Sequence, residues 1–294
     1  MIPAPHLRRR TAGVAVATAV LVLLSACDDA PREPAADPSP SATARQPSAD
    51  QPSAPRRTVA APSVDPEPPP LAGVVVVLDP GHQLGNAAFP DEVSAPVEAG
   101  GFTKPCNTTG TATDAGYSEA TFAWVVARAT QRFLRRLGAT VLLTRSSNSP
   151  SSWGPCVDQR GRAGNPGRPG PTAHLKISIH ADGSLAAGAR GFHVIAPEAR
   201  TPWTDDIAAP SLRLARVVRD VLVGEGFTTS TYAGSDGIDV RGDLGTLNLS
   251  DIPSVMVELG NMRDPDDARV MSSATGRRHY ASALARSVER FFAR

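Results

Sequence analysis

Short apolar runs that end in a turn recur through the second part of the chain. Residues 74–78 contain four valines and a leucine, which predicts a strand buried on both faces. Pro80 and Gly81 break that strand, and His82 follows at once. Further apolar runs predict strands at 139–144, 174–179, 191–196 and 254–257.

Apolar residues at helical spacing fill the segments between these strands. Ser118 is a typical N-cap for a helix that Gly138 closes. Other helices are expected at 156–163 (with Arg160 and Arg162 exposed), 210–222, from 264, and at about 275–292. The order β, α, β, α, β, β, α, β, α predicts an α/β fold, with a mostly parallel central sheet and helices on both faces.

Two stretches lack a clear period and are predicted to be loops. Residues 83–117 are rich in Gly, Thr, Pro and Asn, and a loop of this length is usually functional, disordered or covalently held. Residues 228–250 are rich in Gly and Asp, and we expect them at the mouth of a site.

Residues 1–27 have the character of a signal peptide. Arg8, Arg9 and Arg10 precede an apolar run at 12–24, which is too short to span a membrane comfortably. The segment ends in Leu-Ser-Ala-Cys27, which resembles a bacterial lipobox, so lipidation of Cys27 is expected. An ordinary signal peptide that happens to contain a cysteine is the alternative. The arginines leave twin-arginine export open beside the Sec route.

The next segment has the composition of a spacer. Residues 28–70 hold 12 of the 28 prolines, together with Ser and Ala, and predict a disordered tether. In polyproline geometry, at about 3.1 Å per residue, it would reach on the order of 130 Å. Residues 71–294 are then a single domain, long enough for a substantial core.

Charge and cysteine content narrow the possible functions. The formal net charge of +1 gives no sign of nucleic-acid binding. Two cysteines remain after Cys27, and in an exported chain Cys106 and Cys156 are expected to form a disulfide. Closing a loop of this size stabilises a fold by about 4 kcal/mol in the chain-entropy model. A pair of metal-binding thiolates is the alternative.

Ionisable residues follow three of the predicted strands. These residues are His82, His180 and Glu258, and Glu119 starts the first helix. Since the carboxyl ends of parallel strands share one edge of a sheet, these side chains are expected to meet. Two imidazoles and a carboxylate, with water as the open ligand, form a hydrolytic zinc site, and a further carboxylate can act as general base.

Each of these residues also has a plainer interpretation. His82 could be structural, and Glu119 could simply complement the helix dipole. His174 and His193 fall within predicted strands and are interpreted as packing or surface residues. The chain has no His-Glu-x-x-His helix, which excludes a site of the thermolysin type.

Four motifs together resemble a known family. Leu-Asp-Pro-Gly-His (78–82), Gly-Tyr-Ser-Glu (116–119), Ser-Ile-His-Ala-Asp (178–182) and Val-Glu-Leu-Gly-Asn (257–261) are similar to the motifs of zinc-dependent N-acetylmuramoyl-L-alanine amidases of type 3. The resemblance covers residues 71–294 and is greatest to compact single-domain actinobacterial members, which carry a similar paired-cysteine loop. Many members have Gly directly after the first histidine, where this chain has Gln83.

The resemblance implies an activity and a set of roles. The family cleaves the amide between the lactyl group of N-acetylmuramic acid and the L-alanine that begins the stem peptide. By resemblance, His82, Glu119 and His180 bind one zinc ion, and Glu258 is the catalytic carboxylate. Glu258 would accept a proton from water and deliver it to the leaving amine.

Three further residues are candidates for supporting roles. Asp182 and Asn261 lie beside motif residues and are expected to orient the ligands. Arg241, in the segment before the last strand, could hold a peptide carboxylate, with a solvated surface arginine as the alternative.

The expected partners are peptidoglycan and its muropeptides, and the membrane through the lipid anchor. The protein is expected to be a monomer, exported and anchored on the outer face of the membrane, with its catalytic domain in the cell wall. We see no separate wall-binding module, so the tether would raise the local concentration instead. A non-catalytic amidase-like lipoprotein that binds or regulates, and a zinc peptidase that cuts within the stem peptide, are the alternatives.

Overall fold

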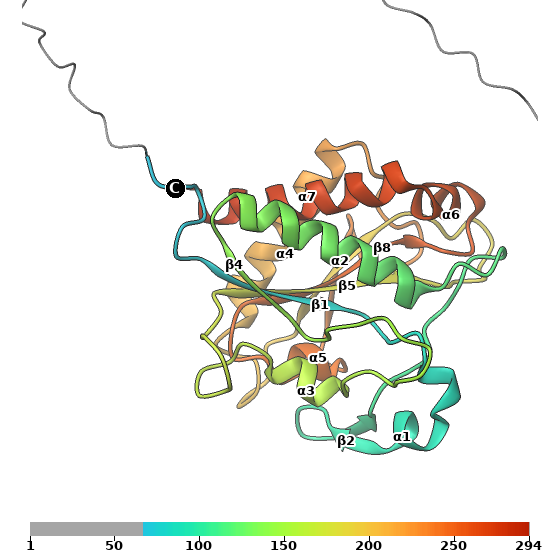
Figure 1. Ribbon diagram of the computed structural model, residues 1–294, viewed down its shortest axis with the longest axis horizontal. Helices are drawn as coiled ribbons and strands as arrows, with labels where there is room; N and C mark the ends of the chain where they lie inside the picture. The colour runs from blue at the N-terminus through green and yellow to red at the C-terminus, as the bar shows by residue number, and fades with distance from the viewer. Residues whose placement is uncertain (1–66, 294) are drawn as a thin grey trace, which may run out of the picture. The chain divides into compact units, whose positions relative to one another are not determined.

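A six-stranded sheet runs through residues 67–293, the part of the chain that the computed structural model describes. The expected signal peptide, Cys27 and most of the expected tether lie outside the described residues. The strand order is β4-β1-β5-β8-β6-β7, and Figure 1 labels β4, β1, β5 and β8 of this sheet. The strands are β1 (Val75–Pro80), β4 (Thr140–Leu143), β5 (Leu175–Asp182), β6 (His193–Pro197), β7 (Ile238–Arg241) and β8 (Ser254–Asn261).

The sheet is mostly parallel, as the order of elements predicted. Among its neighbouring pairs only β6 and β8 run antiparallel. The chain between β5 and β6 holds no helix, so it reverses direction there instead of crossing over to a parallel position.

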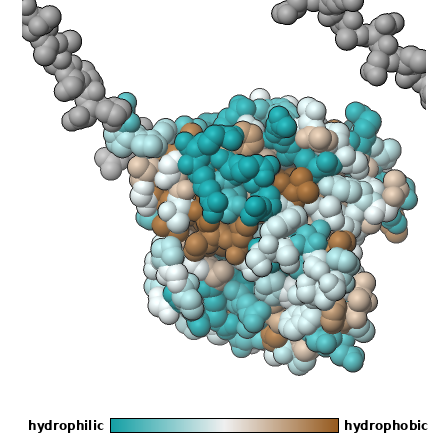
Figure 2. All heavy atoms as spheres, in the orientation of Figure 1, coloured by the Kyte–Doolittle hydropathy of each residue, from teal (hydrophilic) through white to brown (hydrophobic). Residues whose placement is uncertain are grey.

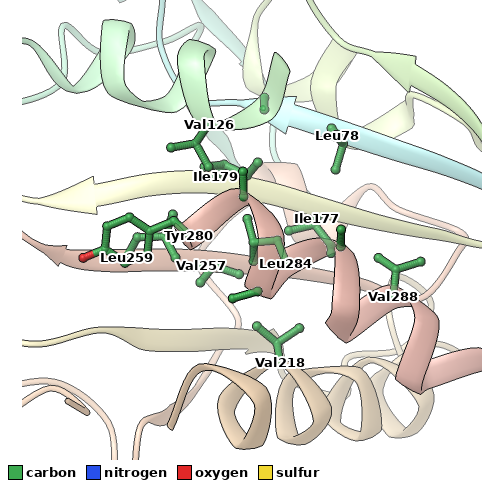
Figure 3. Close-up of a cluster of buried hydrophobic side chains, with 14 of the residues drawn as sticks. Leu78, Val126, Ile177, Ile179, Val218, Val257, Leu259, Tyr280, Leu284 and Val288 are labelled. Atoms are coloured by element: carbon green, nitrogen blue, oxygen red, sulfur yellow. The ribbon is translucent and has the colours of Figure 1, made fainter. Parts of the chain in front are cut away.

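The larger helices cover one face of the sheet. There α2 (Glu119–Arg136), α4 (Ala208–Gly224) and α7 (Ala274–Phe292) pack on a common apolar core, with α6 (Pro265–Ser272) leading into α7 (Figure 1). The core side chains drawn in Figure 3, among them Ile177, Ile179 and Val257, point from the strands toward these helices. The outer side of α2 is hydrophilic, above an apolar area at the level of β4 (Figure 2).

Two short helices occupy the other face. These are α3 (Val157–Arg162) and α5 (Gly245–Asn248), which contact each other. Because successive side chains of a strand alternate between faces, the residues that flank Ile177 and Ile179 point to this second face. They are Lys176, Ser178 and His180, so the polar residues of β5 share the face that carries α3 and α5.

Both segments predicted as loops contain regular structure, so those predictions are wrong in part. Residues 83–117 include η1 (Asn86–Ala88), α1 (Pro90–Ser94) and a hairpin of β2 (Pro96–Glu98) and β3 (Thr103–Pro105). Residues 228–250 include the edge strand β7 and helix α5. Elements of three to five residues are too short to leave a hydrophobic period in the sequence.

Cys106 and Cys156 form a disulfide, as the sequence analysis predicted. The bond joins the residue after β3 to the N-cap of α3, and Val157 N donates to Cys106 O at 2.7 Å. The hairpin segment is therefore fastened to the second face of the sheet. In the part of the chain that the structure describes, no helix is long and apolar enough to cross a membrane.

Reducing this disulfide, or replacing both cysteines by serine, should loosen residues 83–117. The disulfide joins cysteines that are 50 residues apart in the sequence, so its loss should lower the free energy of unfolding by about 4 kcal/mol. Limited proteolysis with mass mapping should then find new cleavage sites within that segment, compared with the oxidised protein. An unchanged cleavage pattern would contradict the idea that the disulfide holds the segment in place.

Candidate active site and metal-binding cluster

Three predicted ligands meet at the carboxyl edge of the sheet. Glu119 Oε1 lies 3.0 Å from His82 Nε2 and 2.9 Å from His180 Nδ1. One ligand atom from each residue lies within 4.8 Å of the others. His82 follows β1, Glu119 begins α2 and His180 lies in β5. Their meeting agrees with the prediction that strand ends share one edge of the sheet.

Small residues allow this convergence. A Cβ atom on Gly81 would lie only 2.4 Å from the His180 ring, and one on Gly110 would lie 2.8 Å from Glu119 Oε2. His82 itself has a φ of 53°, in the left-handed region that non-glycine residues seldom adopt. The turn after β1 thus directs His82 toward the other two ligands.

Hydrogen bonds orient the ligands from behind. His82 Nδ1 donates to Thr108 O at 2.9 Å, which leaves the Nε2 lone pair free to bind a metal. Glu119 Oε2 accepts from Thr111 N at 2.9 Å. Although burial acts in the opposite direction, His82 and His180 hold the pKa of Glu119 well below its ordinary value. Two imidazoles and a carboxylate are a donor set that suits a divalent metal such as zinc.

Glu258 lies in β8 between two histidines of neighbouring strands. Its register partners are His180 in β5 and His193 in β6. Its Oε2 atom is buried and has no hydrogen-bond partner among residues 67–293. Burial, Asp182 and Glu119 raise the pKa of Glu258 well above its ordinary value. A partly buried carboxylate beside a metal cluster can exchange protons with a reacting water.

All four residues line one cavity of about 510 Å³. Much of its wall comes from residues 104–105, 107–111, 180–183 and 244–246, so segments far apart in the sequence form it together. The cavity brings the three candidate metal ligands and the Glu258 carboxylate together at one place, with room for a ligand beside them. This set of groups is capable of metal-assisted hydrolysis.

A buried ion pair supports the site from below. Arg160 Nη1 lies 2.7 Å from Asp79 Oδ1 and 2.8 Å from Pro80 O, and Arg160 Nη2 donates to His82 O at 2.8 Å. The expectation that Arg160 is exposed is therefore wrong, since only 3% of it is exposed. Although burial opposes it, Arg160 holds the pKa of Asp79 well below its ordinary value. Helix α3 is too short for a sequence period to reveal which face is buried.

Asp182 lines the cavity but contacts other residues than the ligands. It accepts a hydrogen bond from Tyr232 Oη at 2.6 Å and lies 3.5 Å from His193 Nδ1. His193, interpreted from the sequence as a packing or surface residue, is buried beside Glu258. No sequence pattern pointed to Tyr232, whereas the alternation along 191–196 could have placed His193 on the face of the site. His174 is exposed and lies just before β5.

Asn261 and Arg241 are committed to local contacts. Asn261 Nδ2 donates to Ser184 O and Ala189 O, which fastens the segment between β5 and β6. Arg241 makes two hydrogen bonds to Asp243, at 2.9 and 2.8 Å, and is not part of the cavity wall. A role for Arg241 in holding substrate stays a prediction.

Comparisons with known proteins agree with this geometry. The family profile described as N-acetylmuramoyl-L-alanine amidase matches residues 76–290. N-acetylmuramoyl-L-alanine amidase Rv3717 of Mycobacterium tuberculosis is 42% identical over 76% of this chain and 88% of its own length. The solved structures of the N-acetylmuramyl-L-alanine amidase Ami1 from Mycobacterium smegmatis and Mycobacterium abscessus are 38% and 39% identical, with TM-scores of 0.68 and 0.69. Each match covers 76% of this chain, and 98% and 100% of the respective relatives.

Replacing Asp79 by Asn should lower the free energy of unfolding by about 3 kcal/mol, because Arg160 would stay buried without a charged partner. Folding lowers the pKa of Asp79 below its ordinary value of 3.8, so the ionised side chain stabilises the wild type fully above that pH. This stabilisation fades as the pH falls below 3.8, and the difference in stability between wild type and Asp79→Asn should shrink with it. Urea unfolding at pH 7 and pH 3 measures both effects.

Asp266→Asn is the matched control, because Asp266 pairs with Arg269 at the surface. It should change the free energy of unfolding by less than about 1 kcal/mol at either pH. Equal effects of the two substitutions would contradict a structural role for the buried pair.

Proposed function

Because the chain belongs to the N-acetylmuramoyl-L-alanine amidase family, we propose that it hydrolyses the amide between the lactyl group of N-acetylmuramic acid and the L-alanine of the stem peptide with the help of one zinc ion. It is a hydrolase that acts on peptidoglycan of the cell wall. The observation that supports the zinc mechanism is the convergence of His82, Glu119 and His180 beside Glu258 in one cavity.

His82 Nε2, His180 Nδ1 and a carboxylate oxygen of Glu119 are the atoms that would hold the ion. Zinc supplies Lewis acidity toward the scissile carbonyl and the attacking water. The carbonyl of Thr108 keeps the His82 proton on Nδ1, and the backbone N–H of Thr111 holds the second oxygen of Glu119. These contacts keep the donor atoms aimed at a common point before the metal arrives.

Glu258 moves the protons of the reaction. Its carboxylate accepts a proton as the water oxygen bonds to the lactyl carbonyl carbon. The same proton then passes to the alanine nitrogen as the carbon–nitrogen bond breaks, which yields a carboxylic acid and an amine. The unpaired Oε2 and the raised pKa suit a group that must first take up a proton and then release it.

The proposal includes an extracytoplasmic location. Residues 1–27 would direct export, Cys27 would carry the lipid, and residues 28–70 would span the distance from the membrane to the wall. The catalytic domain, residues 71–294, would act as a monomer. A non-catalytic binding role is less well supported, because the chain retains both the three ligands and Glu258.

The purified protein with zinc should split muramoyl-dipeptide into its N-acetylmuramic acid and dipeptide halves, as measured by product mass. A chelator should abolish the cleavage, and added zinc should restore it. A stem-peptide peptidase would leave the muramic acid–alanine bond intact. Absence of any cleavage, with the metal content verified, would favour the binding protein.

Glu258→Gln should retain one zinc ion but lower kcat by about 10²–10⁴-fold, because the general base is removed. His82→Ala should instead lose the metal, as measured by elemental analysis of the dialysed protein. Glu92→Gln, on the exposed side of α1, is a matched control that should change neither quantity. Near-native activity of Glu258→Gln would disprove the assigned role.

A further inference from the structure

A second cavity lies at the carboxyl end of β4, and the turn after β1 borders both cavities, because His82 lines the catalytic cavity and Gln83 lines this one. Its volume is about 530 Å³, and we call it the Trp153 cavity after its most prominent lining residue. Trp153 is one of the few large apolar residues that are exposed within residues 67–293, with 38% of its surface accessible. The rest of the lining is mostly polar and consists of Gln83, Leu143, Thr144, Arg145, Ser146, Ser147, Ser152, Gly154, Pro155 and Gln159.

The loop that carries Trp153 is fastened to the turn that carries the metal ligand. Gln83 directly follows His82, and its Oε1 accepts from Ser149 N at 3.1 Å. Asn86 Oδ1 accepts from Gly154 N at 2.9 Å. A Cβ on Gly85 would lie 2.4 Å from Ser152 O, so the two segments are in close contact. The Trp153 cavity is thus held in a fixed position relative to the catalytic cavity.

The charge of the lining argues for a neutral ligand. The cavity has no carboxylate, and Arg145 is its only charged residue. The guanidinium of Arg145 is 5% exposed and donates to backbone carbonyls, among them Ala120 O at 2.8 Å and Ser147 O at 2.7 Å. Because the Arg145 donors are already used by these carbonyls and the side chain is buried, its charge is not presented to an anionic ligand.

Polar groups around the exposed ring are free to bind a ligand. Among the described residues, the hydroxyls of Ser146, Ser147 and Ser152 and the indole N–H of Trp153 have no hydrogen-bond partner. An exposed aromatic face surrounded by hydroxyls suits a pyranose, whose C–H face packs on the ring while its hydroxyls bind the rim.

We propose that the Trp153 cavity binds an N-acetylhexosamine unit of the glycan strand, beside the muramic acid whose amide is cut. This inference rests on the proposed function, because a polymeric substrate extends beyond the scissile bond. The neighbouring sugar then has to lie against the surface next to the catalytic cavity, and the loop of residues 145–154 is fixed there.

Kinetics on two substrates test this subsite. On a soluble glycan of at least four sugars that carries stem peptides, Trp153→Ala should raise KM about tenfold with kcat unchanged. Tenfold corresponds to about 1.4 kcal/mol. Muramoyl-dipeptide, which lacks the neighbouring sugar, should be cleaved by Trp153→Ala as by the wild type. Trp153→Phe keeps an aromatic face and should restore most of the affinity.

Val223→Ala is the control, since Val223 is similarly exposed (47%) but lies on α4. It should leave KM unchanged on both substrates. Equal loss on both substrates with Trp153→Ala, or no loss on the glycan, would overturn the proposal. If the wild type cleaves neither substrate, the proposed function fails instead, and binding must be measured directly.

Direct binding can be followed through the indole N–H resonances. The chain has three tryptophans, and the signal that disappears in Trp153→Ala identifies Trp153. A tetramer of N-acetylglucosamine should shift that signal and leave the other two unchanged. No shift, or an equal shift of all three, would overturn the proposal, as would a shift of the Trp153 signal caused by the free stem peptide alone.

Discussion

The buried ion pair between Asp79 and Arg160 is the contact on which the site depends most. Arg160 joins the end of β1 to α3, and the same guanidinium holds the carbonyl of His82. A charged group that is 3% exposed is tolerable only with a paired partner and further hydrogen bonds, and Arg160 has both. Helix α3 begins at the disulfide, so the pair couples the covalent link to His82.

The alternation of side chains along the strands then decides which residues meet. In β5 and β8, the apolar residues pack under α2, α4 and α7, and His180 and Glu258 face the other side. A shift of β5 or β8 by one residue would turn the polar side chains toward the core and the apolar ones away from it. The packing of the apolar core therefore fixes which face His180 and Glu258 occupy. The antiparallel strand β6 places His193 on the same face, beside Glu258.

The sequence predicted most of the sheet and the convergence of His82, Glu119 and His180, because apolar strands that end in ionisable residues can be recognised from the sequence alone. It did not predict the burial of Arg160, since a six-residue helix has too few positions to show an apolar face. Nor did it predict β7, whose residues are only half-buried at the sheet edge. Tyr232 reaches Asp182 from 50 residues away, and no local pattern encodes such a contact.

The turn after β1 contributes one residue to each of the two cavities, because of the position of β1 in the sheet. Because β1 lies between β4 and β5, the residues after it have the β5 end on one side and the β4 end on the other. His82 faces the first and lines the catalytic cavity, whereas Gln83 lines the cavity beside Trp153. A glycine at position 83 would lack the side chain that receives Ser149 N, so the loop of residues 145–154 would lose one of its ties. Gln83, which differs from the glycine of many family members, is therefore the residue that ties the loop of residues 145–154 to the turn after β1.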